Sequence, residues 1–172
     1  MPEFSPDYCP DCGGELEVRS IEARERLWCS DCENVEWLNP KICAGIIVTR
    51  DNEILLQKRG IWPRKGTWSI PGGFLELEES TLEAAKRETF EETGLKVVGE
   101  PEFLDHVKIE NPDGSRVVMA VYTIDHSSTE GSLSPEEDEV EELKFWSFEE
   151  VFSNKDEIEQ EAYLDLIKEI KK

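Results

Sequence analysis

The sequence predicts an α+β fold in which strands flank one central helix, with a small metal-stabilised domain in front. Two observations predict it. Four of the five cysteines form two close pairs near the N-terminus, Cys9 with Cys12 and Cys29 with Cys32. After them, short segments rich in β-branched and aromatic residues lie on both sides of a single segment with helical periodicity. A chain of 172 residues can build one main core and a small appendage whose stability has another source.

The cysteine pairs predict the small domain. They are CxxC motifs with sixteen residues between them, which is the spacing of a four-thiolate zinc site. The predicted zinc ligands are Cys9, Cys12, Cys29 and Cys32. The short strands expected between them, 15–20 and 25–28, cannot fold without a metal ion, so zinc is expected to be structural. Two disulfides are the alternative, but the first residues lack the order of a secretory signal, and a reducing compartment favours zinc.

The charge of the chain limits its partners. The formal net charge is −21 at pH 7, whereas nucleic-acid-binding proteins neutralise phosphates with clustered Lys and Arg. Nucleic acid is therefore not an expected partner. No apolar run is long enough to cross a bilayer, so we expect no membrane partner and a cytoplasmic protein.

The main domain is expected to begin after the ribbon, where Pro40 marks a boundary. This assigns residues 1–38 to the zinc ribbon and residues 39–172 to the main domain. Strands are predicted at 42–49, 53–59, 103–109, 117–124 and 143–147. The polar residues 127–139 predict a loop, and residues 156–170 predict a helix packed on the core.

The central helix is expected from Ser80 to Thr93, with Ser80 or Thr81 as its cap and Gly94 as its stop. Its second half carries three acids, Glu88, Glu91 and Glu92. Carboxylates there oppose the helix dipole and repel one another, and Arg87, which can pair with Glu83 or Glu91, cannot neutralise all three. A bound divalent cation would do so, because carboxylate oxygens are ligands that suit magnesium or manganese. The alternative is a solvated, charged helix face.

The helix and its preceding loop form one continuous pattern. The sequence reads Gly73, five residues, Glu79, seven residues, then Arg87-Glu88-Thr89-Phe90-Glu91-Glu92-Thr93-Gly94-Leu95. Over residues 73–95 this pattern resembles the Nudix box at all of its polar and glycine positions. Thr89 departs from the usual pattern, which has a larger apolar residue there. The resemblance implies an α/β/α sandwich with a mixed sheet, in which a loop, a helix and a second loop present glutamates to a metal.

The resemblance also implies roles within the box. Glu88, Glu91 and Glu92 would bind Mg²⁺ or Mn²⁺, together with the backbone carbonyl of Gly72. The box positions given structural roles are Gly73, Glu79, Arg87 and Gly94. In these enzymes the metal neutralises a diphosphate and lowers the pKa of the attacking water.

Residues outside the box are expected to complete the site. In this family the general base is a box glutamate or one on a distal loop, and Glu139 ranks first among the acids of residues 136–142. Arg59 and Arg64 are candidates to bind substrate phosphates, with exposed surface charge as the alternative. Trp68 is a candidate to stack on a base, with core packing as the alternative.

A zinc ribbon joined to such a domain resembles the members that include NADH, ADP-ribose and FAD pyrophosphatases. The NADH enzymes are expected to carry a Ser-Gln-Pro-Trp-type segment after the box, and residues 96–103 lack it. We therefore expect a small nucleotide substrate, ADP-ribose or FAD, with NADH and nucleoside triphosphates as alternatives. The resemblance makes a homodimer plausible. A noncatalytic nucleotide sensor, whose ribbon contacts a partner, is the alternative of another class, and the full set of glutamates disfavours it.

Overall fold

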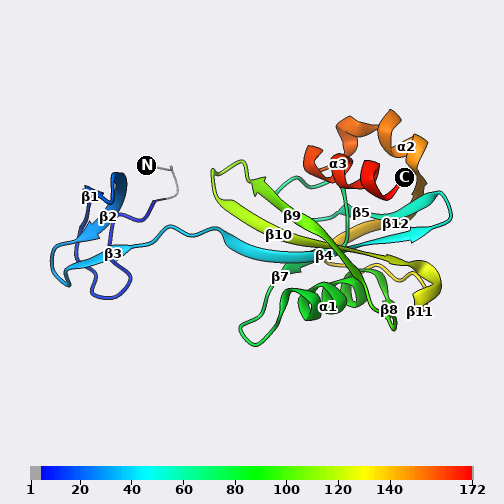
Figure 1. Ribbon diagram of the computed structural model, residues 1–172, viewed down its shortest axis with the longest axis horizontal. Coiled ribbons are helices and arrows are strands. Elements are labelled where there is room, and N and C mark those ends of the chain that lie inside the picture. The colour runs from blue at the N-terminus through cyan, green and yellow to red at the C-terminus, as the bar shows by residue number, and fades with distance from the viewer. Residues whose placement is uncertain (1–4, 172) are drawn as a thin grey trace. The chain divides into compact units, whose positions relative to one another are not determined.

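The computed structural model describes residues 5–171, which divide into two compact units (Figure 1). One unit contains the described residues up to Pro40 together with Glu110–Arg116, and the other contains Lys41–Ile109 and the residues from Val117 onward. Within the described part of the chain, no helix has the length and apolar character needed to span a membrane.

The first unit is built on a three-stranded antiparallel sheet. Its strands lie in the order β1 (Leu16–Ile21), β2 (Arg24–Cys29) and β3 (Asn34–Glu36). Glu22 and Ala23, which connect the first two strands, both have positive φ, as a two-residue hairpin turn of the primed type requires. Leu27 and Cys29 are buried, at 5% and 1% exposure. Strand β3 was not expected, because three residues are too few to give a periodic signal.

The second unit contains a mixed sheet. Its main strands, in spatial order, are β12 (Val140–Ser147), β5 (Glu53–Arg59), β4 (Lys41–Arg50), β10 (Arg116–Asp125) and β9 (Glu102–Glu110). Strand β4 pairs in parallel with β10 and antiparallel with β5, which in turn pairs antiparallel with β12. Two short strands, β6 (Trp68–Ser69) and β7 (Gly72–Phe74), pair with β5 and β4.

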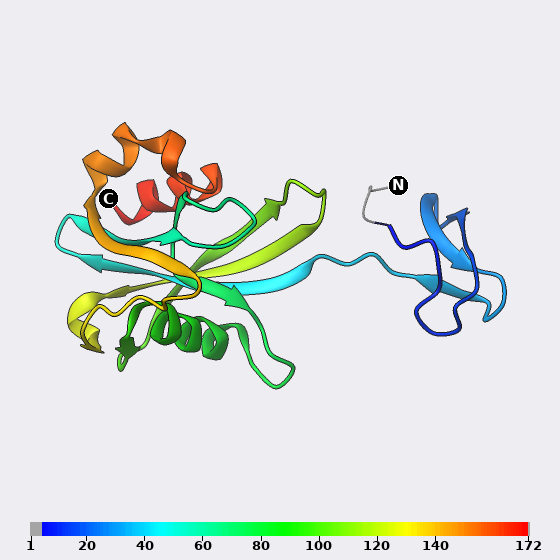
Figure 2. The same ribbon diagram turned by 180° about the vertical axis from the view of Figure 1, so that it is seen from behind.

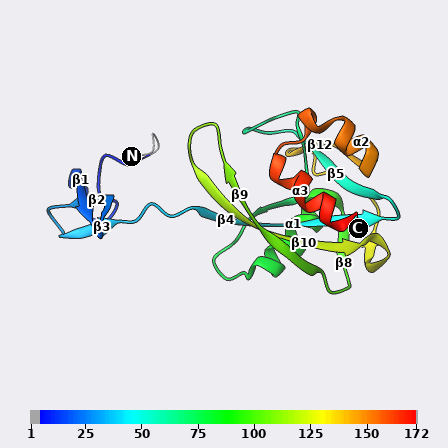
Figure 3. The ribbon, with the colours of Figure 1, turned by 45° about the horizontal axis from the view of Figure 1, so that its top comes forward.

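Helices cover both faces of this sheet. Helix α1 (Thr81–Thr93) lies on one face, while α2 (Phe148–Ser153) and α3 (Glu161–Ile170) lie on the other (Figures 1 and 2). The last two helices contact each other (Figure 3). Strand β5 shows why two cores form, because successive side chains point to opposite faces. Leu55 joins the cluster beneath α1, whereas Leu56 joins the one beneath α2 and α3. The expected α/β/α sandwich with a mixed sheet is confirmed.

The caps of α1 match their prediction. The Ser80 hydroxyl accepts a hydrogen bond from the Glu83 N–H at 3.3 Å, and the Glu83 carboxylate accepts one from the Ser80 N–H at 2.9 Å. Gly94, with φ of 75°, ends the helix, and its N–H donates to the Phe90 carbonyl. The loop, helix and second loop are therefore held at both ends.

The prediction of one terminal helix over 156–170 was wrong in its first part. The helix begins at Glu161, and Lys155–Glu157 form a 3-10 turn. Ile158 is extended and bridges to Trp68, whose carbonyl accepts the Glu159 N–H at 2.7 Å. This pairing with a segment far away in the sequence overrides the helical pattern.

The expected loop over 127–139 also contains regular structure. Residues His126–Ser128 form a 3-10 turn, and Thr129–Gly131 form strand β11. This strand pairs with β8 (Leu95–Val97), which follows the central helix. The Ser134 N–H then donates to the Thr93 carbonyl at 2.9 Å. The segment that leads to Glu139 is thereby attached to the end of α1.

Candidate active site and metal centre

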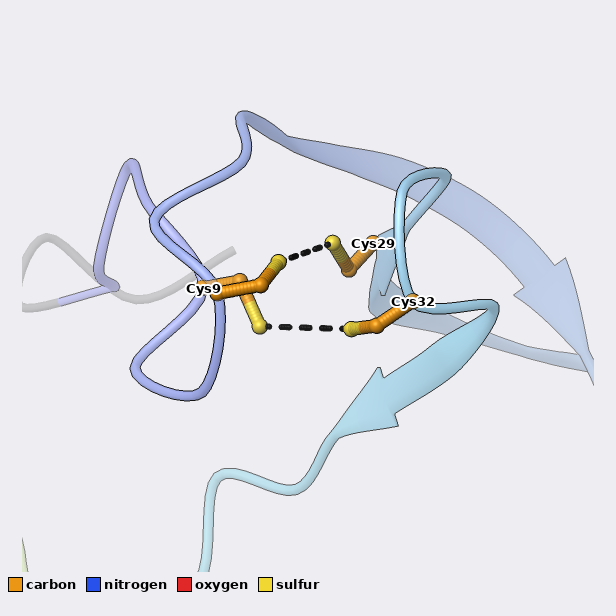
Figure 4. Close-up of side chains that lie close together, drawn as sticks. Cys9, Cys29 and Cys32 are labelled. Atoms are coloured by element: carbon orange, nitrogen blue, oxygen red, sulfur yellow. Dashed lines mark hydrogen bonds between the residues drawn. The ribbon is translucent and has the colours of Figure 1, made fainter.

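The four predicted cysteine ligands lie together in the first unit. Their sulfur atoms all lie within 4.8 Å of one another. Figure 4 shows the side chains of Cys9, Cys29 and Cys32 close together. The Cys9–Cys32 and Cys12–Cys29 sulfur separations are 3.6 and 3.4 Å, which exceed the ~2.05 Å of a disulfide. Tetrahedral coordination with metal–sulfur bonds of ~2.3 Å places sulfurs about 3.8 Å apart. The geometry therefore fits a four-thiolate metal site and excludes the two disulfides.

The thiols of Cys29 and Cys32 have pKa values shifted in opposite directions. The Cys32 backbone N–H donates to the Cys29 sulfur and lowers the pKa of Cys29 to about 7. The pKa of Cys32 is raised, chiefly because its thiol is hydrogen-bonded to the Cys29 sulfur. Four sulfurs this close cannot all be thiolates without a positive charge among them, and a metal cation would supply that charge.

In the second unit, Arg87 is the centre of an ion-pair network on α1. Its guanidinium contacts both carboxylate oxygens of Glu79, at 2.7 and 2.8 Å, and donates to the Phe74 carbonyl at 3.0 Å. Its Nη1 contacts Glu88 Oε1 at 2.8 Å and Glu91 Oε2 at 2.9 Å. The expected pair with Glu91 therefore forms.

The expected alternative partner of Arg87, Glu83, is instead part of the capping box and lies in the first turn of α1. Glu79 takes its place and anchors the loop before the helix. The pKa of Glu79 falls to about 2, chiefly because Arg87 stabilises the carboxylate, and the Glu76 N–H also donates to it. The Arg87 guanidinium thus connects the loop before α1 to the helix face that carries Glu88 and Glu91.

Glu92 differs from the other acids because it is buried. Its residue is 5% exposed, and its Oε2 accepts the Gly72 N–H at 2.6 Å. The Gln57 side chain also favours the ionised form of this carboxylate. Burial raises the pKa of Glu92 to about 8, although Gln57 and Gly72 both favour its ionised form. Among the ion pairs of residues 5–171, none reaches Glu92, and the neutral Gly72 N–H holds its carboxylate.

Two glycines allow the loop to approach the helix. A Cβ on Gly73 would lie 2.5 Å from Glu88 Oε1. A Cβ on Gly72 would lie 2.5 Å from the Ala44 carbonyl oxygen and 2.6 Å from the Gly45 Cα. Gly72 therefore requires glycine, because a Cβ there would meet the backbone of β4, whereas a Cβ at Gly73 would displace the Glu88 carboxylate.

The glutamate carboxylates of α1 are suitable ligands for a divalent cation, although their oxygen atoms lie farther apart than the cysteine sulfurs. Among the described residues, the four cysteines form the only cluster of three or more Asp, Glu, His or Cys side chains whose ligand atoms all lie within 4.8 Å of one another. Arg87 takes one oxygen from Glu88 and one from Glu91, so each carboxylate retains a second oxygen. The last turn of α1 has no basic residue to balance these charges.

Glu139 lies near enough to this site to act on it. Burial raises the pKa of Glu88, and the charges of Glu91 and Glu139 raise it further, against the opposing effect of Arg87. Glu139 itself is exposed, and its backbone carbonyl accepts the Gly60 N–H at 2.7 Å. The structure therefore brings the predicted distal acid into the electrostatic field of the box.

The predicted substrate-binding residues separate into two groups. Arg59 lies beside the box: its charge acts on Glu92, its Nε is 3.8 Å from Glu159, and it also donates to the Pro63 carbonyl. Arg64, which has φ of 63°, lies in the loop that follows β5. Trp68 requires a correction, because it is 5% exposed and packs 5.0 Å from the Trp146 ring. Its indole belongs to the core, so it is not presented to a base.

Two residues near the site were missed. Gln57, at 1% exposure, contacts Glu92, and the Glu159 side chain, at 9% exposure, contacts Arg59. A signal for Gln57 was present, because it interrupts the apolar run Ile54-Leu55-Leu56 in a strand that is otherwise buried. Glu159 gave none, because it lay inside an expected amphipathic helix.

Comparison with known proteins agrees with this geometry. The family model described as NUDIX domain matches residues 39–167. An ADP-ribose pyrophosphatase of Methanocaldococcus jannaschii is 48% identical over 59 residues, 34% of this chain and 35% of that protein. A Vibrio parahaemolyticus protein named NAD-capped RNA hydrolase NudC is 26% identical over 150 residues, 84% of this chain and 52% of its own length. The chain thus spans about a third to a half of these relatives.

Solved structures extend the match to nearly the whole chain. A crystal structure of a NUDIX hydrolase from Nitrosomonas europaea superposes with a TM-score of 0.73 and 28% identity, covering 95% of this chain and 89% of that one. A MutT NUDIX hydrolase from Burkholderia pseudomallei gives a TM-score of 0.64 and 26% identity, over 77% and 98% of the two chains. Together with the glutamate-bearing loop and helix, these matches show that the chain belongs to the Nudix family.

Proposed function

We propose that this protein is a Mg²⁺- or Mn²⁺-dependent pyrophosphohydrolase that cleaves a nucleoside diphosphate linked to another group, with ADP-ribose or FAD as substrate. The observation that carries the proposal is the α1 glutamate cluster, which Arg87 and Glu79 hold against a glycine loop. Such a cluster is destabilising by itself, and a metal–diphosphate complex supplies the missing positive charge.

The chain offers ligands of suitable chemistry. Glu88, Glu91 and Glu92 would hold the metal, with the Gly72 carbonyl as a further ligand from the loop. When bound, the metal would neutralise the diphosphate and lower the pKa of the attacking water. Arg87 fixes the carboxylates of Glu88 and Glu91 by one oxygen each, so their orientation is set in advance.

Residues around the box would complete the reaction. Glu139 would accept the proton of the attacking water, which its position near Glu88 supports. Arg59 would meet a substrate phosphate, because its charge already acts on Glu92 and its side chain is 19% exposed. Arg64 would assist from the loop that follows β5. The preorganised charges would stabilise negative charge on the leaving phosphate.

The relatives support two substrate classes. A protein named ADP-ribose pyrophosphatase gives 48% identity, which favours a sugar-linked diphosphate. Proteins named NAD-capped RNA hydrolase match a longer stretch, which favours NAD, NADH or an NAD-capped RNA as a second candidate. Residues 96–103 lack the segment expected of the NADH enzymes, so ADP-ribose and FAD remain the first candidates.

The cysteine site would hold a structural zinc ion. Four sulfurs close the coordination sphere and leave no position for a substrate. Thiolate binding of this kind is expected in a reducing compartment such as the cytoplasm.

Product analysis tests the proposed reaction. The protein is incubated with Mg²⁺ or Mn²⁺ and ADP-ribose, FAD, NADH, dGTP or an NAD-capped oligoribonucleotide, and products are separated by chromatography. Release of AMP from ADP-ribose or FAD, and its absence with Glu92→Gln, is the expected result. Cleavage of NADH and capped RNA alone would select the second candidate. No cleavage by folded, zinc-loaded protein would favour a noncatalytic nucleotide sensor.

A further inference from the structure

One residue beside the metal-binding glutamates has no obvious structural purpose. Gln57 lies on β5 at 1% exposure, between the buried Leu56 and the half-buried Lys58. Its side chain favours the ionised form of Glu92, yet its Oε1 has no hydrogen-bond partner among the described residues. A buried amide with an unpaired oxygen lowers stability, and an apolar residue would pack there more favourably.

The position of Gln57 is set by the strands, not by its own network. Its register partner on β6 is Ser69, also 1% exposed, whose hydroxyl is likewise without a partner in the structure as described. Cross-strand partners point to the same face of a sheet. Because Leu55 on that face packs in the cluster beneath α1, the Gln57 side chain faces the helix that carries Glu92.

We propose that Gln57 is a positioning residue that orients the Glu92 carboxylate for the divalent metal. This inference rests on the proposed function, because it concerns the same metal site. The Gly72 N–H from the loop donates to Glu92, and the Gln57 amide, which faces the same helix from the sheet, would be the second donor. Two donors from different elements fix a carboxylate plane better than one, so the ligand is aligned before the metal arrives.

The chemistry of an amide suits this task. An Arg or Lys at the same place would also orient Glu92, but its charge would satisfy the carboxylate permanently and compete with the metal. A Gln side chain donates a hydrogen bond without neutralising its acceptor. Glu88 and Glu91 are treated differently, since Arg87 contacts them and each is more exposed than Glu92. Glu92, the most buried of the three proposed ligands, is therefore the one placed beside neutral donors.

The test compares Gln57→Leu with Leu56→Val, a control on the same strand whose side chain belongs to the opposite core cluster. Mn²⁺ affinity is measured by electron paramagnetic resonance, and kcat and KM are measured on whichever nucleotide the parent protein cleaves. Gln57→Leu is expected to weaken Mn²⁺ binding or lower kcat by about 10- to 100-fold, the range found for residues that support metal ligands, without changing KM. Leu56→Val is expected to lower the melting temperature and leave Mn²⁺ affinity unchanged.

A second comparison shows whether Gln57 acts through Glu92. In a Glu92→Gln background, adding Gln57→Leu should weaken Mn²⁺ binding no further. An equal further loss in that background would overturn the inference, as would unchanged Mn²⁺ affinity and kcat in Gln57→Leu. If the parent protein binds no Mn²⁺ and cleaves no nucleotide, the proposed function fails first and the inference with it.

Discussion

Substitutions at the two loop glycines, Gly72 and Gly73, are expected to affect stability and activity differently. The Cβ of a Gly73→Ala variant would meet the Glu88 carboxylate, the far end of a flexible side chain, which can move aside. We expect the melting temperature to change little and the activity to fall by about 100-fold, because displacing a catalytic group by about 1 Å has an effect of that size. Thermal unfolding and steady-state kinetics on the cleaved nucleotide check this.

Gly72 provides the contrast. An added Cβ there would meet the Ala44 carbonyl oxygen and the Gly45 Cα, which belong to the backbone of β4 and cannot move aside. Gly72→Ala should therefore lower both the melting temperature and the activity. If Gly73→Ala were as unstable as Gly72→Ala, or fully active, the described packing of the loop against Glu88 would be incorrect.

Also at the residue scale, the Glu79–Arg87 pair gives a pH dependence. The pKa of Glu79 is lowered to about 2 from an unfolded value near 4.3, chiefly by Arg87. A lowered carboxyl pKa adds stability above the unfolded value, and this is lost as the pH falls toward 2. The melting temperature of Glu79→Gln should therefore lie below that of the parent at pH 7, and the gap should close as the pH approaches 2. The exposed neighbour Glu78, changed to Gln, should show no such gap.

At the scale of elements, the cap of α1 holds the glutamate helix at its start. Ser80→Ala removes the hydroxyl that accepts the Glu83 N–H and should lower the free energy of unfolding by about 1 kcal/mol. Chemical denaturation measures it. Ser153, an exposed serine in the last turn of α2, should change that free energy by less than about 0.5 kcal/mol when replaced by Ala. Equal effects of the two variants would contradict the assigned cap.

Element-scale prediction from the sequence succeeded where the signal was local. The capping box, the Gly94 stop and the strand at Glu53–Arg59 follow from neighbouring residues, and the structure shows each of them. It failed where distant segments pair. Ile158 is extended because it bridges to Trp68, and Thr129–Gly131 form a strand because they pair with Leu95–Val97. Such pairings leave no periodic signal in either segment.

The candidate site shows the same division. The cysteine pairs were predicted from their spacing, and the box glutamates from the resemblance to the Nudix box, and both patterns have fixed separations along the chain. Gln57 was not, because its contact with Glu92 joins a strand and a helix 35 residues apart in the sequence. For Trp68 the sequence left stacking and core packing open for a related reason, since its burial depends on Trp146 and the segment around Ile158.

At the scale of the whole molecule, the two units should respond differently to metal removal. A strong zinc chelator should expose four of the five thiols to an alkylating reagent, while Cys43 stays unreactive. Cys43 is 8% exposed, and burial raises its pKa to about 12, so almost no thiolate is present. Mass spectrometry of the alkylated protein counts the modified residues. Modification of all five at once, or of none, would contradict a metal held by these cysteines.

The chelation experiment also has a matched control. Cys43→Ser should bind as much zinc as the parent, measured by atomic emission, whereas Cys12→Ser should bind less, because it removes one of the four clustered sulfurs. Equal zinc content in both variants would place the zinc elsewhere.

The central claim is that the buried end of the α1 glutamate cluster forms a catalytic metal site, and the most direct measurement compares two glutamates of one helix. Glu92→Gln and Glu83→Gln are assayed for Mn²⁺-dependent release of AMP from ADP-ribose or FAD. Glu83 belongs to the capping box, and Glu92 lies against the glycine loop. The account predicts activity near that of the parent for Glu83→Gln and a loss of at least about 100-fold for Glu92→Gln. Equal activity of the two variants would contradict it.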